Sequence, residues 1–341
     1  MQKKIFIVIK ILLILIIFSA CSGRNGGLSM PEKVYVSVLF TPESFCEIGY
    51  NDITLKAIEN YSSKYGYEYS FCVPASIADG MDYYRKWCEA QLNDNVCRSL
   101  FIFASSLYDE PLAQALHPID EPRKDILIFE LEKELPYAYT FYMSYYGASY
   151  MIGSYCLKYC PIDFHIIAAN PYLGGLCDVV NGLSAVTQDM SSGTVNASYI
   201  SESPSGGLDD DQGAFLACMK AYESNQDGAN LFIPYAGVSN LGVYRFSQTN
   251  GQMTIGIDCV DPDSFSHTLF SMNKKMDLAL DDFLQRWING CEIPRHTLYT
   301  LESGKVVVDR SAKLDFDSQT LETLQEEAIV KEKEYYKNKG R

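Results

Sequence analysis

Short apolar segments alternate with segments of helical periodicity along this chain, and the alternation occurs twice. A run of four to eight apolar residues is typical of a buried strand, whereas apolar residues at every third or fourth position indicate a helix. The predicted strands are residues 33–40, 67–73, 99–104 and 125–129, and then 164–169, 195–200, 231–234, 253–257, 297–301 and 305–308. Strict alternation of this kind predicts parallel sheets with helices on both faces. The expected fold class is therefore α/β, with two doubly wound parallel-sheet lobes.

The length of the chain supports two lobes, because about 310 residues beyond the N-terminal segments exceed the ~100–200 residues of a usual domain. The predicted segments are a signal peptide at 1–20, a tether at 21–31, lobe 1 at 32–145 plus about 260–292, lobe 2 at 146–259 plus about 293–312, and a C-terminal helix at 313–341. We expect the final helix to pack on a lobe through Leu321, Leu324, Ala328 and Val330.

The N-terminal segment predicts export. Lys3 and Lys4 precede an almost wholly apolar stretch at residues 5–18, and Ser19 and Ala20 lead into Cys21. This order is typical of a secretory signal with a small-residue cleavage site. A cysteine at the cleavage point predicts a lipoprotein with its lipid on Cys21, held at the periplasmic or extracytoplasmic face of the cell envelope. The alternative is a transmembrane anchor, for which the stretch is short.

The formal net charge of −15 argues against nucleic acid as a partner, since nothing would neutralise the phosphates. It also argues against electrostatic adhesion to anionic lipids. Any membrane attachment is therefore expected to come from the lipid on Cys21. Ten further cysteines permit disulfides in an oxidising compartment, although burial as small apolar side chains is an equal alternative.

Five short motifs follow the predicted strands or begin the predicted helices. They are EIGYN at residues 47–51, ASYMIG at 148–153, YAG at 235–237 with Gly242 and Val243, IGID at 255–258, and SMNK at 271–274 followed by Met276 and Asp277. The last two, which set Asp258 and Lys274 sixteen residues apart, are the most specific part of the resemblance described next.

Through these motifs the sequence resembles the basic membrane protein family of bacterial lipoproteins. The resemblance implies a type 1 periplasmic binding fold, a purine nucleoside or similar small polar ligand between the lobes, and an ABC permease as partner. The chain departs from the family at Val260 and Asp261, where the family has an acid and a glutamine, and at Ser203, where it often has an aromatic. Two alternatives therefore remain. The same fold could bind a sugar or another metabolite, or it could serve a sensory or scaffold role.

Ligands of wound sheets bind beyond the carboxyl ends of the strands, so the residues just after the strands are the candidates. Tyr50 is expected to stack on a base, with Tyr108 and Tyr172 as opposite walls. Each of these tyrosines has the alternative of a half-buried place on a lobe surface. The resemblance adds Tyr235 and Gly237 to the predicted site.

Polar candidates complete the predicted ligand site. Asp258 and Glu47 suit sugar hydroxyls, because a carboxylate accepts charge-assisted hydrogen bonds. Asn51 suits a base edge, and its alternative is the N-cap of a helix. Lys274 is expected to donate to ribose oxygens or to pair with Asp258. Ser105 and Ser106, after the strand at 99–104, are expected to bind ligand or to pack in a loop.

Nothing in the sequence favours an enzyme, a cofactor or a metal site. The four histidines, His117, His165, His267 and His296, are widely separated, and no zinc-protease, nucleophile-elbow or P-loop motif is present. Residues 137–159 hold eight tyrosines, which are expected to form the hinge and cleft rim or to pack the junction of the lobes.

Overall fold

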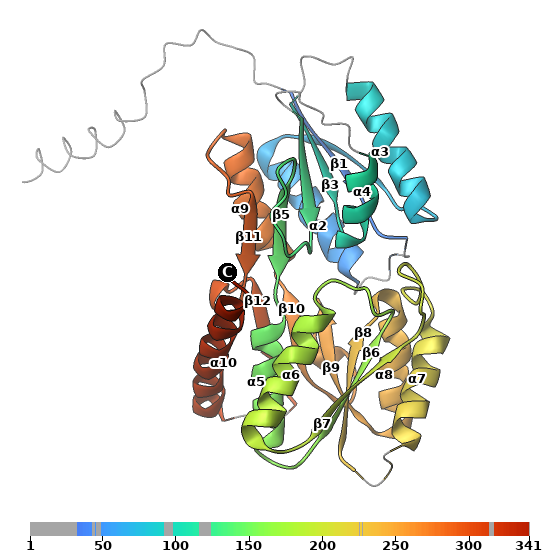
Figure 1. Ribbon diagram of the computed structural model, residues 1–341, viewed down its shortest axis with the longest axis vertical. Helices are drawn as coiled ribbons and strands as arrows, with labels where there is room; N and C mark the ends of the chain where they lie inside the picture. The colour runs from blue at the N-terminus through green and yellow to red at the C-terminus, as the bar shows by residue number, and fades with distance from the viewer. Residues whose placement is uncertain are drawn as a thin grey trace, which may run out of the picture. The chain divides into compact units, whose positions relative to one another are not determined.

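The computed structural model describes residues 33–42, 45, 49–91, 98–115, 124–224, 226, 228–313 and 317–340. The predicted signal peptide, the tether with Cys21, and the candidate Glu47 lie outside the described residues. Within the described part, no helix is both long enough and apolar enough to cross a bilayer. The strands form two six-stranded sheets, which confirms the predicted α/β class with two wound lobes (Figure 1).

Lobe 1 is built on the first sheet, whose strands lie in the order β11-β5-β4-β3-β1-β2 and all run parallel. Its elements are β1 (Val34–Leu39), α2 (Tyr50–Tyr65), β2 (Glu68–Cys72), α3 (Ile77–Gln91), β3 (Arg98–Phe103), η1 (Ser106–Tyr108), α4 (Asp109–Ala115), β4 (Lys124–Phe129), β5 (Tyr139–Met143), α9 (Met276–Ile288) and β11 (His296–Tyr299).

Lobe 2 is built on the second sheet, in the order β12-β10-β9-β8-β6-β7, in which only β12 runs antiparallel to its neighbour. Its elements are α5 (Tyr146–Leu157), β6 (Asp163–Ala168), α6 (Leu176–Met190), β7 (Thr194–Tyr199), α7 (Asp211–Glu223), β8 (Asn230–Tyr235), η2 (Gly237–Ser239), α8 (Asn240–Asn250), β9 (Met253–Asp258), η3 (Pro262–Ser264), β10 (Thr268–Lys274) and β12 (Val306–Arg310). The turn η4 (Leu301–Ser303) connects β11 to β12, and α10 (Ser318–Asn338) packs beside α5.

Burial explains why these segments adopt their structures. The central strands β3 and β6 are buried at every position after the first, as expected of parallel strands covered on both faces. Helix α9 buries Met276, Leu280 and Phe283 along one face, at helical spacing. Helix α2 ends at Gly66, whose φ of 72° lets the chain leave the helix in the left-handed conformation.

The chain passes three times between the two sheets within the described residues. The crossings lie between β5 and α5, between β10 and α9, and between β11 and β12. The predicted division of the lobes was wrong at two strands. β10 pairs with β9 in lobe 2 rather than belonging to lobe 1, and β11 pairs with β5 in lobe 1 rather than belonging to lobe 2.

Helix α10 contacts two of these crossings through a buried carboxylate. Glu332 is 1 % exposed and accepts hydrogen bonds from the backbone N–H of Gly147 at 3.2 Å and of Leu301 at 2.9 Å. Gly147 lies just beyond the first crossing and Leu301 lies in the third. A Cβ atom on Gly147 would lie 2.7 Å from a Glu332 carboxylate oxygen, so a glycine is needed there. Glu332 therefore ties both crossings to α10.

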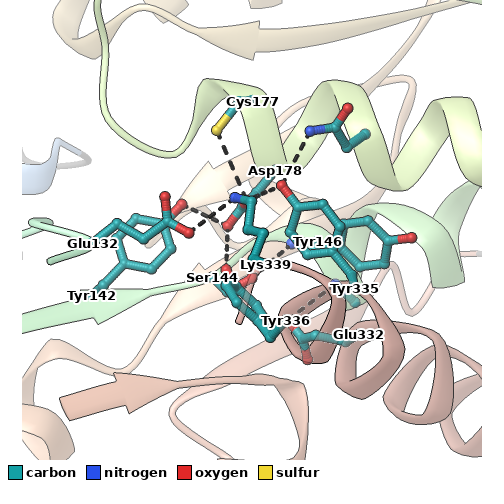
Figure 2. A network of polar contacts seen from close by, with 12 residues as sticks. Glu132, Tyr142, Ser144, Tyr146, Cys177, Asp178, Glu332, Tyr335, Tyr336 and Lys339 are labelled. Atoms are coloured by element: carbon teal, nitrogen blue, oxygen red, sulfur yellow. Dashed lines mark hydrogen bonds and ion pairs between the residues drawn. The ribbon is translucent and has the colours of Figure 1, made fainter. Parts of the chain in front are cut away.

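A second buried carboxylate, Asp178 on α6, gathers donors around it (Figure 2). It accepts hydrogen bonds from the hydroxyl groups of Tyr142 at 2.5 Å, Tyr336 at 2.7 Å and Tyr335 at 3.1 Å. The Lys339 ammonium lies 3.7 Å from the same carboxylate and 2.9 Å from Glu132 of lobe 1. Asp178, Glu332 and these partners are called the hinge cluster below.

The predicted apolar face of α10 was only partly right. Ala328 is buried, but Val330 is 54 % exposed. The buried positions that follow Ala328 on the same face are Glu332 and Tyr336, both of which are polar. The helix thus packs on lobe 2 through hydrogen bonds as well as through apolar contact.

Candidate functional site

A cavity of about 100 Å³ lies where the carboxyl ends of strands from both sheets meet. The residues that line it from lobe 1 follow β1, β3 and β4 or begin α2, and those from lobe 2 follow β6, β7 and β8 or end β8, β9 and β10. They are Thr41, Tyr50, Ala104, Ser105, Ser106, Leu107 and Glu130 from lobe 1, and Leu173, Gly174, Leu208, Tyr235, Ala236, Gly237, Ile257, Asp258 and Lys274 from lobe 2. This is the position expected for the ligand site of wound sheets.

A buried ion pair joins the two lobes at this cavity. The Lys274 ammonium, at the end of β10, lies 2.9 Å from a carboxylate oxygen of Glu130, which directly follows β4. The two side chains are 4 % and 10 % exposed. Removing two charges from water is costly unless each has a partner, so the pair depends on the two lobes being together.

Asp258 presents a second carboxylate at the end of β9. The Tyr145 hydroxyl donates to its Oδ1 at 2.9 Å, and the backbone N–H of Asp258 donates to the Tyr145 oxygen at 3.2 Å. Asp258 has a φ of 63° and Glu130 a φ of 57°, both in the left-handed region that non-glycine residues rarely adopt. Such strain is concentrated at functional sites, and here both strained residues carry the cavity's carboxylates.

Burial raises the pKa of both carboxyl groups. Desolvation is the largest cause for Glu130 and for Asp258, and the nearby Lys274 ammonium opposes it in each case. The Asp258 charge further raises the pKa of Glu130, because a nearby like charge disfavours the ionised carboxylate. We call Glu130, Asp258, Lys274, Tyr50 and Tyr145 the cleft cluster.

Two aromatic rings surround the ammonium of Lys274. Its Nζ lies 4.6 Å from the ring centroid of Tyr145 and 5.5 Å from that of Tyr50. Tyr50 also donates its hydroxyl to Glu130 at 3.1 Å. The faces of aromatic rings attract a cation, so the two rings help to fix the position of the Lys274 ammonium.

Gly174 brings lobe 2 into close contact with lobe 1. A Cβ atom at this position would lie 2.6 Å from the hydroxyl oxygen of Ser106 and 3.1 Å from the backbone oxygen of Glu130. The carbonyl of Gly174 also accepts a hydrogen bond from Tyr235 at 2.7 Å. The absence of a side chain at Gly174 therefore permits the lobes to approach this closely.

The structure brings seven of the predicted site residues to the cavity. They are Tyr50, Ser105, Ser106, Tyr235, Gly237, Asp258 and Lys274. Lys274 forms its ion pair with Glu130, although the prediction offered Asp258 as its carboxylate partner. Lys274 is also the last residue of strand β10, whereas a place at the start of a helix had been expected.

Three predicted residues do not line the cavity. Tyr108 is fully buried in the core of lobe 1, where its hydroxyl donates to the backbone oxygen of Phe40 at 2.6 Å. Tyr172 is 60 % exposed. Asn51 is buried and accepts a hydrogen bond from Thr41 at 3.2 Å. The predicted opposite walls of Tyr108 and Tyr172 are therefore wrong for this arrangement.

Sequence reasoning missed two residues of the cleft cluster. Glu130 directly follows the predicted strand at 125–129, which is the position at which the cleft was expected, so a signal was present. Tyr145 belongs to the tyrosine-rich stretch at 137–159, where one tyrosine is not distinguishable from the other seven by pattern alone. Among the described residues, no group of three or more His, Cys, Asp or Glu side chains is placed to hold a metal ion.

Comparison with known proteins identifies the fold. No family model matches the chain, and no curated protein matches it. Three similar solved structures are an ABC transporter solute-binding protein from Aeropyrum pernix K1, a transcriptional activator of the comK gene from Bacillus halodurans, and GanP, a glucose-galactose binding protein from Geobacillus stearothermophilus.

The likeness to these structures is extensive although the sequences have diverged. The TM-scores are 0.64, 0.60 and 0.60, at 14 %, 14 % and 13 % identity. The matches cover 88 %, 87 % and 83 % of this chain and 86 %, 96 % and 100 % of the other chains, in the same order. The chain thus has the type 1 periplasmic binding protein fold. Proteins described as solute-binding proteins and as a transcriptional activator share this fold.

Proposed function

We propose that this chain is an extracytoplasmic solute-binding protein that closes its two lobes over a small polar ligand and delivers it to an ABC-type permease. One observation carries the proposal. Side chains from the strand ends of both sheets line a single cavity, and the ion pair between Lys274 and Glu130 links the lobes there. Closure by rotation about the three crossings would bury the ligand.

The solved structures of the same fold support a binding role over catalysis. Two of them are described as an ABC transporter solute-binding protein and a glucose-galactose binding protein. No enzyme activity is proposed for the chain.

A nucleoside is the first candidate ligand, as the resemblance to the basic membrane protein family implies. Tyr50 would stack on the base, a contact worth ~1–3 kcal/mol. Asp258 would accept hydrogen bonds from ribose hydroxyls, and Lys274 would donate to ribose oxygens. Ser105, Ser106, Tyr235 and Gly237 would complete the wall. A sugar is the second candidate, because a solved structure of the same fold is described as binding glucose and galactose.

We further propose that a lipid on Cys21 holds the protein at the membrane. The test is metabolic labelling of the expressed chain with a fatty acid. A Cys21→Ser variant is expected to lose the label and to leave the membrane fraction, whereas Cys160→Ser, which changes an exposed cysteine of lobe 2, retains both. Label retained by Cys21→Ser would contradict the lipid anchor.

Thermal-shift measurements on the full chain test the ligand-binding role. A panel of nucleosides and sugars is expected to contain compounds that raise the melting temperature of the native protein but not of Asp258→Ala. The matched control is Asp277→Ala, which removes an exposed carboxylate at the start of α9. If no small molecule stabilises the native protein, the sensory or scaffold alternative replaces this proposal.

A further inference from the structure

The charges of the cleft cavity do not balance. Among its lining residues, Glu130 and Asp258 carry carboxyl groups and Lys274 alone carries a positive charge. With all three ionised, the site holds one surplus negative charge. A buried charge without a partner is strongly unfavourable. The site therefore has to gain a proton, as the raised pKa values of both carboxyls also indicate, or a ligand with a positive charge.

Three of the side-chain hydroxyl donors at the cavity are already committed within the protein. Tyr50 donates to Glu130, Tyr235 to the carbonyl of Gly174, and Thr41 to Asn51. A tyrosine hydroxyl carries one proton, so each of these tyrosines has only acceptor capacity left for a ligand.

The carboxylates retain acceptor capacity. Tyr145 donates to Oδ1 of Asp258, and among the described residues no hydrogen bond reaches its Oδ2. Oε2 of Glu130 is buried and contacts the Lys274 ammonium as an ion pair, with no further hydrogen bond in the described part of the chain. A carboxylate oxygen accepts about two hydrogen bonds. The cavity thus offers free carboxylate acceptors beside a surplus negative charge.

We propose that the cavity binds the protonated amine of a small molecule, held between Asp258 and Glu130. An ammonium group supplies three donors and one positive charge, which match the vacant acceptors and the surplus charge. The body of the ligand would lie against the apolar wall of Leu107, Leu173 and Ile257. This inference rests on the proposed solute-binding function and names the ligand class of that same cavity.

Two matched pairs of compounds test the inference on the full chain by isothermal titration calorimetry. Glucosamine and glucose differ by one amine in place of a hydroxyl, as do 5′-amino-5′-deoxyadenosine and adenosine. We expect the amine of at least one pair to bind at least about tenfold more tightly, because a hydrogen bond to a charged group contributes about 1.5–3 kcal/mol and 1.4 kcal/mol is tenfold in affinity.

The variants Asp258→Asn and Glu130→Gln assign the preference to the cavity. Each is expected to reduce the amine preference at least fivefold, whereas Asp277→Asn leaves it unchanged. Circular dichroism of each variant establishes that it is folded. Tighter binding of the hydroxyl compound in both pairs, or an amine preference unchanged in both cavity variants, overturns the amine inference and leaves the solute-binding proposal standing. Failure of all four compounds to bind overturns the inference together with the nucleoside and sugar candidates.

Discussion

The cleft cluster and the hinge cluster are both built from two buried carboxyl groups, tyrosines and a lysine, yet they differ in how fully the carboxylates are satisfied. In the hinge, Asp178 receives three tyrosine hydroxyls and Glu332 receives two backbone N–H groups. In the cleft, Glu130 accepts from the Tyr50 hydroxyl and pairs with the Lys274 ammonium, Asp258 accepts, among the described residues, from the Tyr145 hydroxyl alone, and both adjoin a cavity.

The difference separates a structural role from a binding role. A carboxylate that is surrounded by protein donors fixes the groups around it, because removing it leaves several buried donors without a partner. A carboxylate with unused acceptors next to a cavity contributes little to folding and is available to a ligand. Residue type is the same in both clusters, and Asp258 is the only one of the four carboxylates that is partly exposed, so the count of committed donors is the more informative quantity.

The largest expected effect is at Asp178. Asp178→Ala removes the carboxylate that accepts from three tyrosine hydroxyls and leaves Lys339 paired with Glu132, and it is expected to lower the free energy of unfolding by about 3–5 kcal/mol. Urea denaturation followed by circular dichroism measures this change. The control is Asp189→Ala on the same helix, whose carboxylate is 42 % exposed and pairs with Lys331. A surface ion pair contributes about 0–1 kcal/mol. Equal losses for both variants would contradict the structural role of Asp178.

The next effect is a pH dependence set by Glu332. Desolvation raises the pKa of Glu332 from 4.5 to about 7, although the N–H groups of Leu301 and Gly147 favour the charged form. Between these pH values the folded chain binds more protons than the unfolded chain, so the contribution of this group to stability falls as the pH rises from about 4.5 to 7. The loss is about 3 kcal/mol, at 1.36 kcal/mol per unit of pKa shift.

Urea denaturation at several pH values between 4.5 and 7.5 tests this contribution. Glu332→Gln cannot ionise, so its free energy of unfolding is expected to fall less steeply with pH than that of the native chain. Glu130 and Asp258 also have raised pKa values and will leave a remaining slope in the variant. Identical slopes for the two proteins would exclude Glu332 as a contributor.

A smaller effect is expected at the contact between the lobes. Gly174→Ala places a methyl group against Ser106 and the backbone of Glu130, and overpacking of this kind typically costs about 1–3 kcal/mol. Under the proposed closure the contact forms when the lobes come together, so the cost should appear in ligand affinity as a loss of about five- to 150-fold. Calorimetry with the tightest of the four compounds measures it. Adding Ser106→Gly removes the nearest obstacle and should restore part of the affinity; no rescue would argue against this contact.

The smallest effect is expected at Asp258, in contrast to Asp178. Asp258→Asn removes the surplus charge from the cleft, and asparagine tolerates the left-handed backbone at this position. The free energy of unfolding without ligand is therefore expected to stay the same or to rise by about 1 kcal/mol. The matched variant Asp178→Asn should destabilise the chain. A clear loss of stability in Asp258→Asn would remove the distinction between the two clusters.

The sequence predicted the wound architecture well because strands buried on both faces are short apolar runs, as in β3 and β6. It did not predict β10, in which Ser271, Asn273 and Lys274 are polar although every one of them is buried. Nor did it predict β5, whose residues are largely tyrosine and phenylalanine. Polar residues in a buried strand hide the apolar pattern on which such predictions depend.

The site was predictable to the extent that it depends on single strand ends. Asp258 and Tyr50, which line the cavity, were candidates because each lies next to one segment with a clear pattern. The pairing of Glu130 with Lys274 depends on two strands of different sheets that are far apart in the chain, and the exchange of β10 and β11 between the lobes likewise depends on pairing between distant segments. Local periodicity carries no information about such contacts.

The position of α10 along the chain has a consequence for biosynthesis. The twelve strands of the described part all precede α10 in the sequence, so both sheets leave the ribosome before Glu332 and Tyr336 do. A nascent chain that lacks these two residues has both lobes but no carboxylate on the crossings at Gly147 and Leu301. The crossings at Gly147 and Leu301 therefore lack this restraint until the turns of α10 that carry Glu332 and Tyr336 emerge.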